Sequence, residues 1–224
     1  YWLYIEKTIR NKMDYSNLDA VFMRYIVYKT SKPVNSRQLY NSFVKLFKDS
    51  GYSQENILKE LRYYAEIFGA FVYGSDKYSD RINKLLYRLR VLNQTTCYPF
   101  LLHVFDDYHQ GVITEETVEK ILQFILAYLL RRMVCGVPSN TLRGLFTYLY
   151  NRIFKVASNK QKYYETLNKF LFTVSSKDVI PSAAEFERAL QKANIYGNNA
   201  LCRFLLLDIE NGDGKEILQA ENLT

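Results

Sequence analysis

The stretch 121–149, ILQFILAYLLRRMVCGVPSNTLRGLFTYL, decides the fold of this chain. Its first ten residues contain one polar side chain, Gln123. That run is too short to cross a bilayer, which requires about 20 apolar residues, so it predicts a helix that is buried on most sides. Arg131 and Arg132 follow it, and a Gly-Val-Pro-Ser corner over 136–139 separates it from a second amphipathic helix.

Helical spacing continues on both sides of this stretch. Thr114, followed by Glu115 and Glu116, predicts a capped and acidic start for a helix over 114–133. Apolar residues recur with a helical period over 57–71, and Pro99 stands in the first turn of a predicted helix over 98–108. The sequence therefore predicts an all-α fold, a bundle of roughly ten helices with no significant sheet.

Local signals place several helix ends and one join. Asn35 with Gln38, and Ser182 with Glu185, have the spacing of capping boxes. The glycine-containing stretch 211–214 predicts the end of the last helix. A loop over 72–80 predicts a smaller N-terminal helical part, 1–75, and a larger part, 76–224, built around the 114–133 helix; one continuous domain is the alternative.

Composition indicates a globular protein without a disulfide framework. Hydrophobic residues make up 48% of the 224 positions and charged residues 24%, and the three cysteines form no Cys-x-x-Cys pair. Free thiols, together with the lack of a signal peptide or transmembrane segment, predict a cytoplasmic protein with no membrane partner. The chain starts without Met inside an apolar run, so we expect it to be a fragment of a longer polypeptide.

The net charge of +7 permits contact with nucleic acid without requiring it. The basic residues are spread along the chain with no block of five or six, which leaves solvated helix faces and a nucleic-acid-facing surface both open. The tyrosine pairs at 63–64 and 163–164 fit packing at the core edge, with stacking on exposed bases as the alternative.

Candidate chemical sites are few. His103 and Asp107 stand four residues apart, a spacing compatible with metal ligation, but no third ligand is identifiable, so we interpret His103 as a surface residue near a helix end. The stretch 208–216, DIENGDGKE, fails the register of a calcium loop, and phosphate-cradling glycine motifs are absent. No catalytic, cofactor-binding or metal-binding residue is predicted.

Two adjacent arginines, Arg131 and Arg132, stand at the end of the apolar helix. Two cations suit the C-terminal end of a helix dipole, yet adjacent helical residues point about 100° apart. One of Arg131 and Arg132 must therefore extend along the surface or pair with a carboxylate, for which Glu210, Glu187 and Asp106 are candidates. A structural ion pair and a contact with a polyanion or partner both remain open.

The order of several motifs resembles a known family. The Arg-Arg-x-x-Cys-Gly segment from Arg131 is followed by an Asn/Thr-capped helix at Asn140, then by FERAL (186–190), then by Tyr196 and LCRFLLLDIE (201–210), which ends at Glu210. Together with CYPFLLHVF (97–105), these motifs resemble the helical middle region of GmrSD-type restriction proteins, which join the domains of unknown function 262 and 1524. Arg131, Arg132, Asn140, Tyr196 and Glu210 are the candidate structural or interface residues.

The resemblance implies a role rather than a reaction. In that family an N-terminal domain with a Gly-Gln-Gln-Arg motif serves nucleotide hydrolysis, and a His-Asn-His-type nuclease opens with Glu-His-Ile-x-Pro. Neither motif occurs in this sequence, so no catalytic residue and no cofactor is transferred to it. The implied function is a non-catalytic connector in a type IV, modification-dependent restriction protein of phage defence, with its flanking modules and DNA as partners. A nucleic-acid-binding module and a protein–protein adaptor are the alternatives.

Overall fold

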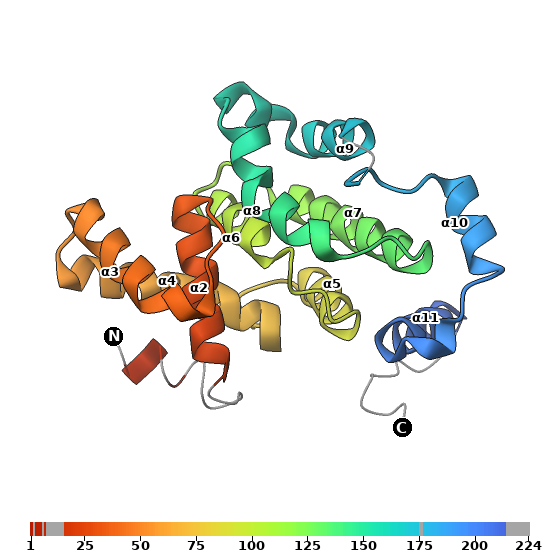
Figure 1. The fold of residues 1–224 in the computed structure, drawn as a ribbon, viewed down its shortest axis with the longest axis horizontal. Helices are drawn as coiled ribbons and strands as arrows, with labels where there is room; N and C mark the ends of the chain where they lie inside the picture. The colour runs from red at the N-terminus through yellow and green to blue at the C-terminus, as the bar shows by residue number, and fades with distance from the viewer. Residues whose placement is uncertain (2, 6, 8–15, 175–176, 214–224) are drawn as a thin grey trace.

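The computed structural model describes residues 1, 3–5, 7, 16–174 and 177–213, and this part of the chain contains no strand. Between residues 16 and 213, ten α-helices and three short 3-10 helices confirm the all-α prediction (Figure 1). The N-terminal elements are α2 (Ser16–Thr30), η1 (Ser36–Gln38), α3 (Leu39–Ser50), α4 (Gln54–Tyr73) and α5 (Asp80–Val91). They are followed by α6 (Tyr98–His109), α7 (Glu115–Val134), α8 (Asn140–Phe154), η2 (Ala157–Lys162), α9 (Tyr163–Thr173), α10 (Ala183–Leu190), η3 (Ile195–Gly197) and α11 (Asn199–Asp213).

Helix α7 is the central element, as its apolar sequence predicts. The Thr114 hydroxyl accepts a hydrogen bond from the Thr117 backbone N–H at 3.3 Å and caps its start. Five residues of its inner face are completely buried: Val118, Ile121, Leu122, Ile125 and Leu129. The helix packs against α5, α6, α9, α10 and α11.

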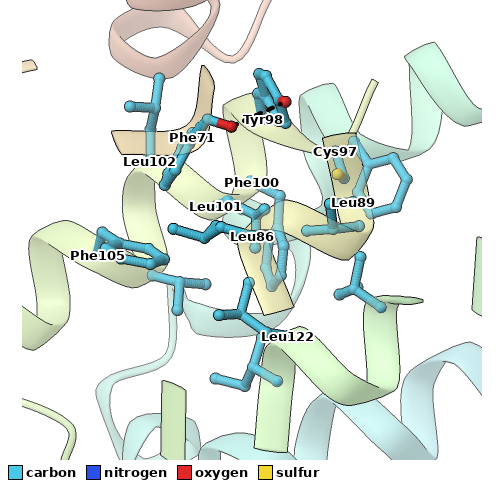
Figure 2. Close-up of a cluster of buried hydrophobic side chains, with 14 of the residues drawn as sticks. Phe71, Leu86, Leu89, Cys97, Tyr98, Phe100, Leu101, Leu102, Phe105 and Leu122 are labelled. Atoms are coloured by element: carbon cyan, nitrogen blue, oxygen red, sulfur yellow. Dashed lines mark hydrogen bonds between the residues drawn. The ribbon is translucent and has the colours of Figure 1, made fainter. Parts of the chain in front are cut away.

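Helix α6 joins the first helices to the later ones. It packs against α2 and α4 and also against α7 and α8. In Figure 2, Leu101 of α6 lies in a cluster with Phe71 of α4, Leu86 of α5 and Leu122 of α7. Side chains from both sides of residue 75 therefore belong to one continuous hydrophobic core.

The chain segment between α4 and α5 is shorter than predicted and is well bonded. Helix α4 continues to Tyr73, so the connection is residues 74–79, and Gly74 turns the chain with φ +81°. The Asn83 side chain donates to the carbonyl oxygens of Ser75 and Tyr78 at 2.7 and 2.9 Å and accepts from the Ser75 N–H at 3.0 Å. These bonds hold the segment against α5.

Two predicted helix ends differ from the structure. Asn35 accepts from the Arg37 N–H, but it caps the 3-10 helix η1, and α3 begins at Leu39 without a capping box. Helix α11 continues through Gly212 to Asp213, because one glycine costs about 1 kcal/mol and does not by itself end a helix; Gly214 lies outside the described residues. The Ser182–Glu185 capping box is confirmed.

The remaining core features agree with the composition. All three cysteines are free thiols; Cys97 is buried, and burial raises the pKa of its thiol to about 12. Cys135 and Cys202 are partly exposed. Among the described residues, no helix combines the length and the apolar content that crossing a membrane requires.

Candidate functional site

Arg132 forms the centre of a clasp at the end of α7. Its side chain is 1% exposed. Nη1 donates to the Lys177 carbonyl at 2.8 Å, and Nη2 donates to the Pro138 carbonyl at 3.1 Å and to the Thr141 hydroxyl at 3.2 Å. The guanidinium carbon also lies 5.5 Å from the ring centroid of Tyr128. One side chain thus ties α7 to the start of α8 and to the segment before α10.

Two neighbouring side chains of α7 bind the same segment. The Tyr128 hydroxyl donates to the Asp178 carbonyl at 2.7 Å, and Arg131 Nη1 donates to the Pro181 carbonyl at 3.2 Å. Burial raises the pKa of Tyr128 to about 12, so its hydroxyl remains a proton donor at neutral pH. We call Tyr128, Arg131, Arg132 and their acceptors the Arg132 clasp.

The predicted ion pair of the arginines is wrong. Arg132 and Arg131 bind backbone carbonyls and a hydroxyl instead of Glu210, Glu187 or Asp106. A guanidinium presents five N–H donors in a planar fork, and the converging carbonyl oxygens of two loops satisfy several of them without a carboxylate. Arg132 therefore occupies the interior, where solvent and charged partners have no access to it.

The other three residues of the resemblance lie apart from the clasp. Asn140 is the exposed first residue of α8; Ser139 occupies the cap position, so the predicted Asn cap is absent and Thr141 binds Arg132 instead. Tyr196 in η3 is 87% exposed. Glu210 is exposed on α11. The hydrogen bonds of the clasp include none of these three residues.

A second polar centre was not predicted and lies on α6. Asp107 is 3% exposed. Its Oδ2 accepts from the hydroxyls of Tyr150 at 2.8 Å and Tyr163 at 3.1 Å, and its Oδ1 accepts from Lys160 Nζ at 2.7 Å. The three donors stand on α8, η2 and α9. They occur 43 to 56 residues after Asp107, so no local pattern reveals them.

Asp106, the preceding residue of α6, makes equivalent contacts to α2 and α4. Its oxygens accept from the hydroxyls of Tyr28 on α2 at 2.8 Å and of Tyr63 on α4 at 3.0 Å. The Tyr64 hydroxyl donates in turn to Tyr28. Burial, followed by the nearby carboxylate, raises the pKa of Tyr63 well above its ordinary value, and burial also dominates the raised pKa of Tyr28. These tyrosines are therefore neutral hydrogen-bond donors that attach α6 to its neighbours.

His103 lies between the two carboxylate centres, enclosed by aromatic rings. Its ring centroid is 4.1 Å from that of Tyr28 and 3.9 Å from that of Tyr150, with which it stacks at an angle of 7°. Burial and then the charge of Lys160 lower its pKa to about 3. The interpretation of His103 as a surface residue is wrong, because the rings of Tyr28 on α2 and Tyr150 on α8 cover it.

The low pKa of His103 predicts a stability loss in mild acid. The unfolded chain gains a proton as the pH falls through 6.5, whereas the folded protein binds it only near 3. The stabilising effect of the neutral ring is thus present above pH 6.5 and is lost toward pH 3, by up to about 1.4 kcal/mol per pH unit. Between pH 7 and pH 5, the free energy of unfolding measured in urea should fall by about 2 kcal/mol more for the wild type than for His103→Gln. Equal losses in the two proteins would contradict the assignment.

His109 ends α6 beside an open cleft. Because the Tyr63 hydroxyl donates to Asp106, we infer that His109 Nδ1–H donates to that hydroxyl at 3.0 Å. His109 Nε2 then accepts from the Tyr78 hydroxyl at 3.1 Å. The cleft of about 690 Å³ is bordered by α4, His109 and the 74–79 segment. Part of its polar lining is paired within the protein, as in the bond from Lys77 to Glu66 at 2.6 Å.

A second hollow, of about 710 Å³, opens between α2, α3 and α4. Phe22, Phe43, Ile57 and Leu61 contribute apolar walls to it. Helix α3 has no fully buried residue, so its apolar face is only partly covered. This groove contains no pair of groups suited to acid–base or nucleophilic chemistry.

The arrangement as a whole is suited to holding helices in place. Among the described residues, no group of three or more His, Cys, Asp or Glu side chains is placed to hold a metal ion. The Arg132 clasp and the Asp106–Asp107 centre both connect elements that are distant in sequence. Comparisons with known protein families, with curated proteins and with solved structures found no match to this chain.

Proposed function

We propose that this chain is the non-catalytic helical connector of a modification-dependent, GmrSD-like DNA restriction protein. It positions an NTPase-like module on its N-terminal side and a His-Asn-His-type nuclease on its C-terminal side. The observation that carries the proposal is the Arg132 clasp. The Arg-Arg-x-x-Cys-Gly segment is the strongest motif of the resemblance. Its second arginine attaches α7 to two loops through hydrogen bonds of 2.8 to 3.2 Å.

The placement of the outer helices is consistent with a connector. Figure 1 shows α2, α3 and α4 at one end of the long axis and α10 and α11 at the other. Modules joined before α2 and after α11 would therefore be held at opposite ends of the helical body. The continuous core between them, which runs from α2 to α11, resists bending because its packed side chains have little room to rearrange.

The proposal predicts that the isolated chain is inactive and that its flanking modules restore activity. We expect the purified chain to show no cleavage of modified duplex DNA and no nucleotide hydrolysis with Mg²⁺ present. The same assays on the full-length gene product should show both activities. Glu-His-Ile-x-Pro encoded shortly after Thr224 would support the connector role. Cleavage or hydrolysis by the isolated chain would contradict it.

Two other functions make different predictions. A nucleic-acid-binding module should shift a DNA probe on its own at low salt, with an affinity that falls steeply as salt is added. A protein–protein adaptor unrelated to restriction predicts a native gene that ends near Thr224 without a nuclease motif. The distribution of surface charge favours the first of these as an additional property of the connector.

A further inference from the structure

The positive charge of the protein is concentrated in one region. Residues 140–174, which form α8, η2 and α9, contain six Lys or Arg residues and one acidic residue, Glu165. This region of 35 residues therefore carries a net charge of +5 out of the +7 of the whole chain. The charge is uneven in the folded protein although no block of like charges appears in the sequence.

Within the described residues, five of these six cations are exposed and have no carboxylate partner within 4.0 Å. One of the five, Arg143, lies at the start of α8; we call the other four, Arg152, Lys155, Lys162 and Lys169, the α8–α9 basic face. Some basic residues elsewhere on the surface are paired along their helices, as in Lys59 with Glu55 at 2.9 Å and Lys120 with Glu116 at 2.7 Å. Surface cations without partners lose no ion pair when they bind an anion.

The remaining charges of the region offset this face only in part. Lys160 points inward to Asp107 at 2.7 Å. Glu165 is exposed and lies three positions after Lys162 and four before Lys169, so its charge leaves the face with a net +3. Glu165 also lies near α7: the pKa of Lys120 is raised first by its bond to Glu116 and additionally by Glu165. Arg143, on the first turn of α8, lies near Arg24 of α2, whose pKa is lowered first by burial and in part by Arg143.

The geometry joins the four cations into one surface. The Arg152 guanidinium carbon lies 5.7 Å from the ring centroid of Phe170, so this α8 residue sits against α9. Lys155 follows Arg152 by three positions on the same side of α8. Lys162 ends η2 at the N-terminal boundary of α9, and Lys169 lies on α9 itself, next to Phe170. Exposed Ser158 and Gln161 between the helices add neutral hydrogen-bonding groups.

We propose that the α8–α9 basic face binds the phosphate backbone of duplex DNA without reading its sequence. Exposed, flexible cations suit the phosphates of a duplex, because contacts to the DNA backbone fix the position of a protein without reading the bases. The hollows beside α2, α3 and α4 and beside His109 are lined by other residues. The choice of DNA over RNA rests on the proposed restriction function, whereas the phosphate contact itself does not.

The test neutralises the face and compares it with an equal loss of charge elsewhere. The first variant replaces Arg152, Lys155, Lys162 and Lys169 by Gln. The control replaces Lys45, Lys48, Lys84 and Arg203, which are also exposed, and so has the same net charge. Binding of a 30-base-pair duplex is measured by fluorescence anisotropy at 50 and 200 mM salt. Thermal melting followed by circular dichroism shows whether each variant is folded. If the fourfold variant of the basic face is not folded, the double variant Lys155→Gln with Lys162→Gln is used in its place.

The expected result is a loss confined to the first variant. Four phosphate contacts predict a slope of log affinity against log salt near −3.6, so the wild type should lose about a hundredfold in affinity between the two salt concentrations. The first variant should bind at least about tenfold more weakly than the wild type at 50 mM salt and with a shallower slope. The control should stay within about threefold of the wild type.

Several outcomes would overturn the proposal. These are no DNA binding by the wild type at 50 mM salt, equal losses in the two variants, or tighter binding to an RNA hairpin or to vesicles containing anionic lipid than to the DNA duplex. None of them concerns the connector role, which is tested by the activity of the full-length protein. The two proposals can therefore fail separately.

Discussion

Replacing Arg132 by Met is expected to lower the free energy of unfolding by about 3 kcal/mol. The change removes the buried guanidinium that donates to the carbonyls of Lys177 and Pro138 and to the hydroxyl of Thr141. Hydrogen bonds to a charged group contribute about 1.5–3 kcal/mol each, and part of that loss is offset because the buried charge is also removed. In a chain of this length the melting temperature should fall by roughly 6–12 °C.

Adjacent Arg131 provides the matched control for this experiment. It is only partly buried and makes one hydrogen bond to a carbonyl, that of Pro181, so Arg131→Met should cost about 1 kcal/mol or less. Arg132→Lys keeps the charge but lacks the planar fork, and we expect it to recover less than half of the loss. Urea unfolding followed by circular dichroism measures all three variants. Equal stabilities of the Arg131 and Arg132 variants would show that the clasp is not a major contribution.

Replacing Asp107 by Ala is expected to have an effect at least as large. The substitution removes the carboxylate that the Lys160 ammonium binds at 2.7 Å and the acceptor of the Tyr150 and Tyr163 hydroxyls. Breaking a buried ion pair by removing one partner costs about 3–5 kcal/mol, because the other charge remains unpaired. The unfolding free energy from urea titration should fall by about that amount.

A second substitution separates the ion pair from the rest of the centre. The double variant, Asp107→Ala with Lys160→Met, contains no unpaired ammonium. Its loss of unfolding free energy should therefore be smaller than the sum of the losses in the two single variants. We expect a coupling energy of about 1–3 kcal/mol. Asp106→Ala, at a partly exposed carboxylate bound by Tyr28 and Tyr63, should cost less than Asp107→Ala. Strict additivity in the double variant would show that Lys160 and Asp107 do not depend on each other.

The sequence by itself determined the helices and their buried faces. The apolar run from Ile121, with Thr114 before it, predicts both the start of α7 and the residues that the structure buries completely. Ser182 with Glu185 likewise predicts the start of α10. These features depend on residues three or four positions apart, and side chains at that spacing meet on any helix whatever surrounds it.

Only the tertiary structure decided what the polar residues bind. Arg132 is bound to a carbonyl 45 positions away, and Asp107 to hydroxyls 43 and 56 positions away. Every residue has a carbonyl and this chain has twenty tyrosines, so no pattern in the sequence ranks one acceptor or donor over another. His103 was misinterpreted for the same reason: its pKa depends on rings that α2 and α8 bring to it. Helical periodicity is a local property, whereas the partners of a buried polar group follow from how distant helices pack.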